Sequence, residues 1–149
     1  MHAVTTLGHA DAQLALVVME REVLRRGGAA VLAVADSHGE LIALLRMDGA
    51  KFASTTIAAN KAYTAAREQV PSKTIGQLAR DGKDGFDIAY FGDDRFVGWG
   101  GGVPVTVGGA CVGAVAVSGL PEAVDIEIAA FAADALVASI AGSGATPTT

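Results

Sequence analysis

The stretch RMDGAKFASTTIAANKAYTAA, residues 46–66, decides the fold that the sequence predicts. It opens with the charged turn RMDG and continues into small residues, which are typical of a helix whose backbone packs closely on another element. Lys61 and Tyr63 lie among the alanines of this segment, and a cation on such a face needs a partner. We therefore predict a helix from roughly Phe52 to Glu68 that forms one wall of a pocket.

Upstream of this stretch, the pattern predicts one helix and one hairpin. Residues 10–26 place apolar side chains at helical spacing, which predicts an amphipathic helix with one buried side. The side chains expected on that side are Leu14, Val17, Val18 and Leu24. Residues 29–36 and 40–45 are apolar runs joined by a turn that contains glycine, so they predict a β-hairpin that leads into the charged turn.

Downstream, Pro71 ends the central helix because proline lacks the amide that a helix needs. A short helix over residues 73–80 and a loop over residues 81–94 follow. The loop is rich in Gly and Asp but also in aromatic residues, and these argue against disorder because they would otherwise be exposed. We expect the loop to be ordered by aromatic side chains that pack against the body.

Three further strands are predicted over residues 95–99, 103–107 and 110–118. The last two are separated only by Gly108 and Gly109, the signature of a two-residue turn with positive φ at both positions. A final helix begins after Pro121. Its expected buried side is made of Val124, Ile128, Phe131, Ala135 and Ile140.

Hairpins dominate this order of elements, so the sheet is largely antiparallel and helices cover it. The prediction is an α+β fold, a three-layer α/β/α sandwich. Residues 1–141 form a single domain, and residues 142–149, made of Gly, Ser, Ala, Thr and Pro, form a flexible C-terminal tail.

Composition limits the possible functions. The chain has 149 residues, of which 51% are hydrophobic, yet no apolar run approaches the roughly 20 residues of a membrane helix. We therefore expect a protein without a membrane partner that hides apolar surface in a homo-oligomer. The N-terminus does not resemble a signal peptide, which favours a cytoplasmic location. A net charge of −5 without a basic cluster argues against nucleic-acid binding.

Candidate site residues gather around the central helix. Gly100, Gly101 and Gly102 either form a tight bend or let the backbone approach a ligand and direct N–H groups at an anion. If Arg46 and Lys61 converge with this bend, they favour an anionic small molecule. Tyr63 and Ser118 are further candidate ligand-binding residues. The only cysteine, Cys111, and three scattered histidines give no metal site.

Three functions remain open at this point. The first is a small-molecule-binding protein with an anionic ligand. The second is a cofactor-independent isomerase or lyase, in which Arg46 holds a carboxylate and Asp48 or Lys61 moves a proton, so that Lys61 and Asp48 are the candidate catalytic residues. The third is an accessory subunit whose surface serves only assembly.

Four motifs resemble the GlcG/HbpS-like, haem-degrading-domain family, which also supplies the C-terminal domain of PduO-type corrinoid adenosyltransferases. The motifs are RMDGA (46–50), AANKAYTA (58–65), GGGVP (100–104) and VGAVAVSG (112–119), followed by Asp125. The resemblance covers roughly residues 11–136. It implies a five-stranded antiparallel sheet flanked by helices, a profilin-like fold and assembly into multimers.

The resemblance also implies that haem is a possible ligand. Haem binding in such proteins is expected to use a histidine, and His9 is the candidate axial ligand in this chain. Where members of the family commonly read Val-Ser-Gly-Gly and later Gln-Asp, this chain has Gly119-Leu120 and Val124-Asp125. These departures lie at one edge of the expected pocket.

Overall fold

The computed structural model describes residues 1–143, which form four α-helices, one 3₁₀ helix and four strands. The elements follow one another as α1 (His9–Arg25), β1 (Val31–Asp36), β2 (Leu41–Arg46), α2 (Ala53–Glu68), α3 (Ser72–Arg80), η1 (Ile88–Phe91), β3 (Gly102–Val107), β4 (Ala110–Ser118) and α4 (Glu122–Ser143). The predicted α+β class is confirmed. α4 extends two residues into the predicted tail, and the rest of that tail, residues 144–149, lies outside the described residues.

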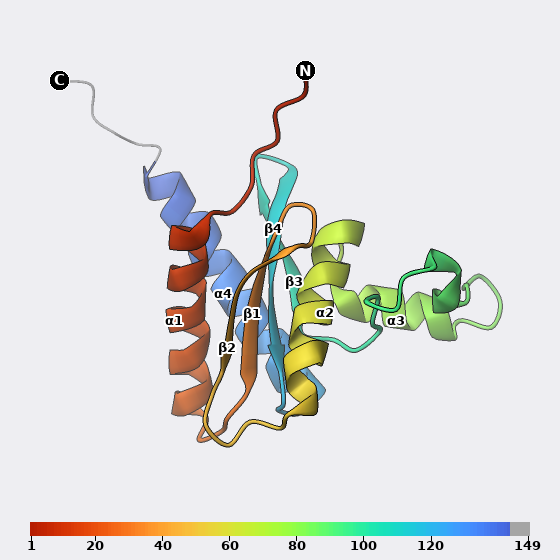
Figure 1. Ribbon diagram of the computed structural model, residues 1–149, viewed down its shortest axis with the longest axis horizontal. Coiled ribbons are helices and arrows are strands. Elements are labelled where there is room, and N and C mark those ends of the chain that lie inside the picture. Colours follow the sequence, from red (N-terminus) through yellow and green to blue (C-terminus); the bar gives the residue numbers. More distant parts are fainter. Residues whose placement is uncertain (144–149) are drawn as a thin grey trace.

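All strand pairs are antiparallel, in the order β2-β1-β4-β3. α2 covers one face of the sheet, while α1 and α4 lie side by side on the other, so the molecule has three layers (Figure 1). The turn between β3 and β4 has φ of 59° at Gly108 and 83° at Gly109. Positive φ at both positions confirms the predicted two-residue hairpin turn.

The small side chains of α2 have the packing role that the sequence predicts. Ala58 and Ala62 are fully buried against Val31 and Ala33 of β1 and Ala116 of β4. Because these side chains are short, the helix backbone comes close to the centre of the sheet. This close approach places Lys61 beside the end of β4.

The sheet has four strands among the described residues, so the expected fifth strand is wrong. Residues 95–99 have a strand-like composition but run as an irregular segment beside α2 and α3. The Val97 amide donates to the Thr64 hydroxyl at 3.0 Å, which replaces a ladder hydrogen bond. Gly98 packs so tightly on Gly76 of α3 that a Cβ at either position would overlap backbone atoms of the other.

Residues 72–99 form an arm that projects from the body and carries α3 and η1 (Figure 1). Inside the arm the rings of Phe91 and Phe96 stack at 3.9 Å, and Phe96 meets Tyr63 of α2 edge to face at 5.4 Å. The expected order through aromatic packing therefore holds for these rings, whereas Tyr90 is 84% exposed. At the base of the arm, the Ser72 hydroxyl donates to the Trp99 carbonyl and accepts from the Gly102 amide.

The arm is also held by an ionic contact that responds to pH. The Tyr63 hydroxyl donates to Asp93 at 2.5 Å, and Arg95 pairs with Asp93 at 3.2 Å. The Tyr63 hydrogen bond, followed by those from Arg95, lowers the pKa of Asp93 from 3.8 to about 2.

Because the folded state holds this carboxylate ionised, its stabilising contribution is present above pH 3.8 and is lost as the pH falls towards 2. We expect amide exchange in residues 86–96 to accelerate in this pH window. Asp93→Asn should abolish the acceleration, and equal protection of the arm at pH 5 and pH 2.5 would contradict the expectation.

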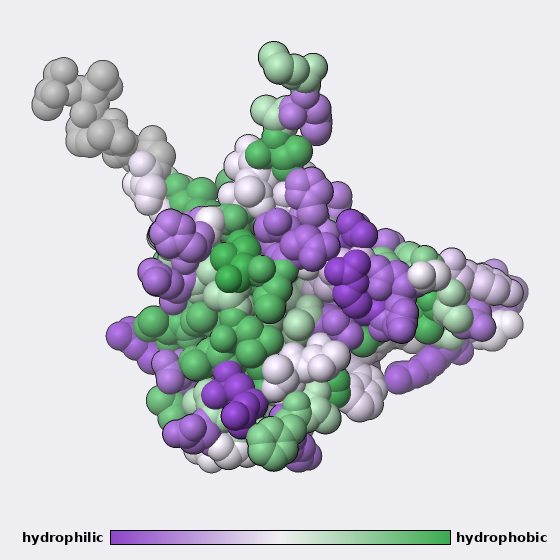
Figure 2. Space-filling view, in the orientation of Figure 1, coloured by the Kyte–Doolittle hydropathy of each residue, from purple (hydrophilic) through white to green (hydrophobic). Residues whose placement is uncertain are grey.

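The predicted buried face of α1 is wrong at three of its four positions, whereas that of α4 is wrong only at Phe131, since Ile128 is fully buried and Val124 and Ile140 pack against the core. The core side of α1 is made of Ala12, Ala15, Met19 and Val23, whereas Leu14 and Val17 are 38% and 41% exposed. In α4, Phe131 is 55% exposed, because its neighbours Ala132 and Ala133 face the core instead. Figure 2 shows hydrophobic side chains gathered on the surface over α1 and β2. Such a surface favours the predicted homo-oligomer, which stays a prediction.

No helix in residues 1–143 is long and apolar enough to cross a membrane. The cytoplasmic location likewise remains a prediction.

Candidate functional site

A half-open pocket of about 370 Å³ lies where α2, the bend before β3 and the turn from β4 into α4 meet. It is lined by Lys51, Ala53, Ser54, Ile57, Lys61, Trp99, Gly100, Ser118, Gly119, Leu120, Glu122 and Asp125. Its size falls within the range of small-molecule sites. Three segments that are distant in sequence therefore contribute to one cavity.

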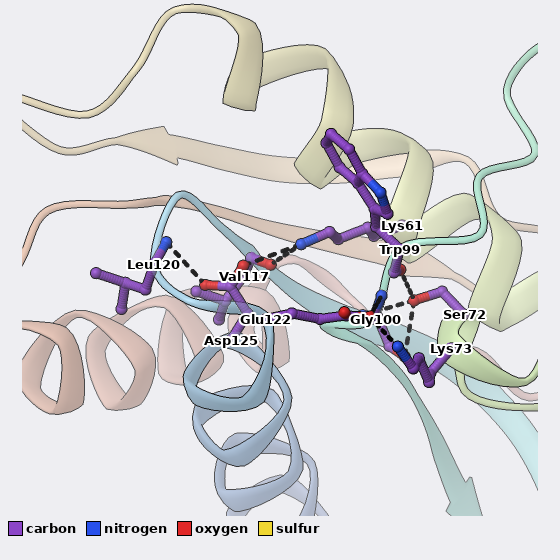
Figure 3. Close-up of polar contacts among 10 residues, drawn as sticks. Lys61, Ser72, Lys73, Trp99, Gly100, Val117, Leu120, Glu122 and Asp125 are labelled. Atoms are coloured by element: carbon purple, nitrogen blue, oxygen red, sulfur yellow. Dashed lines mark hydrogen bonds and ion pairs between the residues drawn. The ribbon is translucent and has the colours of Figure 1, made fainter. Parts of the chain in front are cut away.

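The pocket contains a buried ion pair. Lys61 Nζ lies 3.0 Å from Asp125 Oδ2 and donates a second hydrogen bond to the Val117 carbonyl at 2.9 Å (Figure 3). Both side chains are only 3% exposed. The predicted need of Lys61 for a partner is thus met by the first turn of α4 and the end of β4.

Local structure explains why these groups meet. Gly101 adopts a φ of +119°, and a Cβ at this position would lie 2.9 Å from Lys61 Nζ, so only glycine leaves room for the amine. Asp125 lies in the first turn of α4, where the helix dipole favours a carboxylate. Its Oδ1 accepts the Leu120 amide at 3.2 Å, which fixes the orientation of the carboxylate.

Burial shifts the pKa of both members of the pair towards neutrality. Loss of water lowers the pKa of Lys61, although the charge of Asp125 opposes the shift. The same desolvation raises the pKa of Asp125 against the charge of Lys61. Shifts of this kind, caused by desolvation beside a charged partner in a pocket, cluster at functional sites.

The rim of the pocket is made by Glu122 and Trp99. Glu122 accepts the Gly100 amide at 2.8 Å and pairs with Lys73 at 2.7 Å, and the Lys73 hydrogen bond is the main cause of its lowered pKa. Trp99, the only tryptophan of the chain, is 56% exposed. Its indole is available to stack on a ligand and to report the arrival of one.

Three of the predicted site residues, Lys61, Gly100 and Ser118, line this pocket. Gly101 and Gly102 lie beside it, but the anion nest expected from the glycines is wrong in its details. The Gly100 amide donates to Glu122, and the Gly102 amide donates to the Ser72 hydroxyl at 3.0 Å. Two of the three N–H groups are therefore used within the protein.

The structure does not bring Arg46, Asp48, Tyr63 or His9 into the pocket. The Arg46 guanidinium lies 5.0 Å from the ring centre of Phe52, and Asp48 is exposed. The Tyr63 hydroxyl is bound by Asp93 on the arm, and His9 is exposed at the start of α1. The predicted convergence of Arg46 with Lys61 and the glycine bend is wrong, because the charged turn does not contribute to the pocket lining.

Sequence reasoning missed the roles of Asp125, Glu122 and Trp99. Asp125 follows the quoted motifs, but nothing in the sequence pairs it with a lysine 64 residues earlier. Trp99 was assigned to a strand that does not form. The signal for Glu122 was its place in the first turn of a helix that begins beside the glycine bend.

The pocket does not fit a haem held through its iron. Proteins ligate haem iron with His, Cys, Met or Tyr, and the lining contains none of these residues. The Lys61 amine is already engaged by Asp125 and Val117. His9, the candidate axial ligand from sequence, is not among the lining residues.

A three-layer α/β/α sandwich with one antiparallel sheet and a pocket that holds a buried ion pair at the sheet end defines the structural class. Residues 7–134 match the family model described as "Haem degrading protein HbpS-like". The chain belongs to this family, as the resemblance of its four motifs predicted.

Curated relatives agree with this assignment. A 15.0 kDa protein from the dhaT-dhaS intergenic region of Citrobacter freundii is 32% identical over 116 residues, which cover 78% of this chain and 82% of the relative. Protein GlcG of Escherichia coli K12 is 34% identical over 99 residues, or 66% of this chain and 71% of GlcG.

Solved structures share the fold. ORFY of Klebsiella pneumoniae has a TM-score of 0.87 and 29% identity, over 93% of this chain and 95% of ORFY. A double mutant of Streptomyces reticuli HbpS has a TM-score of 0.81 and 26% identity, over 91% and 90%. A haem complex of PduOC has a TM-score of 0.81 at 22% identity, over 88% and 95%, a likeness that shows the fold alone.

Proposed function

We propose that the protein binds a small anionic metabolite in the pocket at the end of the sheet. The observation that carries the proposal is the Lys61–Asp125 pair, buried to 3% exposure in the wall of a cavity of about 370 Å³. Burying two charges is expensive and adds little stability compared with apolar packing. A buried pair that also lines a cavity is therefore best explained by the chemistry of a ligand.

The charges of the lining favour an anion. Of the two carboxylates, Asp125 is paired with Lys61 and Glu122 with Lys73. Lys51 also lines the pocket and forms no ion pair with any residue in the described part of the chain. One uncompensated cation therefore remains for the carboxylate of a ligand.

Trp99 makes this proposal testable with unmodified protein, because it is the only tryptophan and lies on the rim of the pocket. Titration with small carboxylates should change the Trp99 emission and saturate. The corresponding amides, which lack the charge, should bind at least about tenfold more weakly. Lys51→Gln should remove this preference, whereas Lys83→Gln on the arm should retain it. A flat titration with all carboxylates would count against the pocket as a binding site.

Haem is the alternative ligand, because of the family to which the chain belongs. Since none of the usual haem ligands His, Cys, Met or Tyr lines the pocket, we expect haemin to give no saturable shift of its Soret band at a stoichiometric ratio. A saturable shift that His9→Ala abolishes would instead assign haem binding to the start of α1. Haem binding, rather than metabolite binding in the pocket, would then be the main function of the protein.

Catalysis is the second candidate function, and the desolvated Lys61–Asp125 pair favours it. An isomerase or lyase acting on a carboxylated metabolite would use Lys61 to move a proton. The role first considered for Asp48 has no structural support, because Asp48 is exposed and does not line the pocket.

A further inference from the structure

Lys61 is placed to form a covalent bond, and this inference rests on the proposed function of the pocket. Its nitrogen has two hydrogen-bond partners, the Val117 carbonyl at 2.9 Å and Asp125 Oδ2 at 3.0 Å. A tetrahedral amine nitrogen has one remaining position, which holds a proton in the ammonium form and a lone pair in the neutral form. Desolvated lysines in pockets serve proteins as nucleophiles towards carbonyl compounds.

We propose that Lys61 forms an imine with small 2-oxo acids that enter the pocket. The class of compound follows from the lining: a carbonyl carbon reacts with the Lys61 amine, and a carboxylate on the same molecule pairs with Lys51. The cavity of about 370 Å³ has room for a small metabolite of this class.

Asp125 provides the proton transfers that the reaction needs. The Lys61 ammonium gives a proton to Asp125, and the free amine then attacks the carbonyl carbon. The carbonyl oxygen receives that proton and becomes the hydroxyl of a carbinolamine. A second proton passes from the nitrogen through Asp125 to this hydroxyl, which leaves as water. The result is a carbon–nitrogen double bond, with one water released for each carbonyl consumed.

The surroundings of the amine support this chemistry. Asp125 Oδ2 contacts the reacting nitrogen, while Oδ1 is fixed by the Leu120 amide at 3.2 Å. The hydroxyls of Ser54 and Ser118, both 4% exposed, line the same cavity and can bind the oxygen of the carbinolamine. An imine on Lys61 would also make the carbon next to it more acidic, which is the requirement of the isomerase or lyase function.

The test uses pyruvate and sodium cyanoborohydride, which reduces an imine to a stable secondary amine. The chain has four lysines, Lys51, Lys61, Lys73 and Lys83, so peptide mapping by mass spectrometry assigns every adduct. We expect the adduct at neutral pH to be concentrated on Lys61. Lactate has the carboxylate but no ketone group, so an excess of lactate should suppress the Lys61 adduct and leave any surface background unchanged.

Variants separate the possible roles. Lys61→Arg retains a cation and should lose the adduct completely, whereas Lys83→Arg should retain it. Asp125→Asn keeps the nucleophile but removes the proton carrier, so it should slow the adduct and change the pH profile of its formation. The lactate competition needs no variant and is therefore independent of folding effects.

Trp99 emission distinguishes this inference from the binding proposal. If pyruvate changes the emission but leaves Lys61 unmodified, the imine is wrong and the binding proposal stands. If pyruvate neither changes the emission nor modifies Lys61, the imine is wrong, and the titration with the other carboxylates decides the binding proposal. Modification spread equally over all four lysines would overturn the imine at Lys61 as well.

Discussion

Replacing Lys61 with Met lowers the free energy of unfolding by about 3–5 kcal/mol, which is the usual cost of leaving one member of a buried ion pair without its partner. Both side chains are only 3% exposed, so water offers the Asp125 carboxylate little solvation in place of the lost ammonium group. Urea denaturation followed by far-UV circular dichroism measures the loss.

Two control variants make this prediction specific. Lys73→Met breaks the Lys73–Glu122 pair, whose side chains are 33% and 40% exposed, and should cost no more than about 1 kcal/mol. The double variant Lys61→Met with Asp125→Leu removes both charges and should recover most of the loss, because apolar replacement of a buried pair is commonly tolerated. A single Lys61 variant as stable as the Lys73 variant would mean that the pair is hydrated in solution.

Replacing Gly101 with Ala lowers the free energy of unfolding by roughly 2–5 kcal/mol, because a left-handed conformation and a steric clash both oppose the new side chain. Gly101 has a φ of +119°, and its Cβ would lie 2.5 Å from the Val117 carbonyl oxygen and 2.9 Å from Lys61 Nζ. The substitution therefore strains the backbone and displaces the Lys61 amine. The same denaturation experiment measures the effect.

Neighbouring glycines separate the two causes. At Gly102, where φ is not left-handed, a Cβ would overlap the Lys61 carbonyl group, so Gly102→Ala should cost roughly 1–3 kcal/mol from the clash alone. At Gly108, φ is +59° and no atom lies within 4 Å, so Gly108→Ala should cost roughly 1–2 kcal/mol from the backbone alone. Equal losses at Gly101 and Gly108 would show that the amine has free space beside Gly101.

The elements that the sequence predicted well are those with local causes. Examples are the small residues of α2, the proline that ends this helix and the two glycines between β3 and β4. Each determines the conformation of residues only a few positions away in the sequence. Residues 95–99 show the opposite case. Their composition suits a strand, but the Thr64 hydroxyl takes the Val97 amide and Gly98 packs on Gly76. Thr64 belongs to α2 and Gly76 to α3, and the local sequence pattern of residues 95–99 does not predict where these helices lie.

The candidate site shows the same division. The alanine neighbours of Lys61 predict that its ammonium group is buried and needs a partner. They do not predict that this partner is Asp125, because that depends on how α4 packs on the sheet. Arg46 was misleading because it is near the central helix in sequence. In the structure its guanidinium contacts Phe52 instead, and the pocket receives its free cation from Lys51. Docking of α1 likewise reversed the face expected from Leu14 and Val17.

The base of the arm has a consequence for how this protein can change over evolutionary time. Ser72 and Trp99, at the two ends of the arm, are joined by a hydrogen bond of 2.7 Å. Because its two ends are held together, the arm can gain or lose residues at its far end without displacing β3. The entropic cost of closing a loop depends only weakly on the length of the loop. Insertions there would change the length of the arm while the lysine and its carboxylate stay in place.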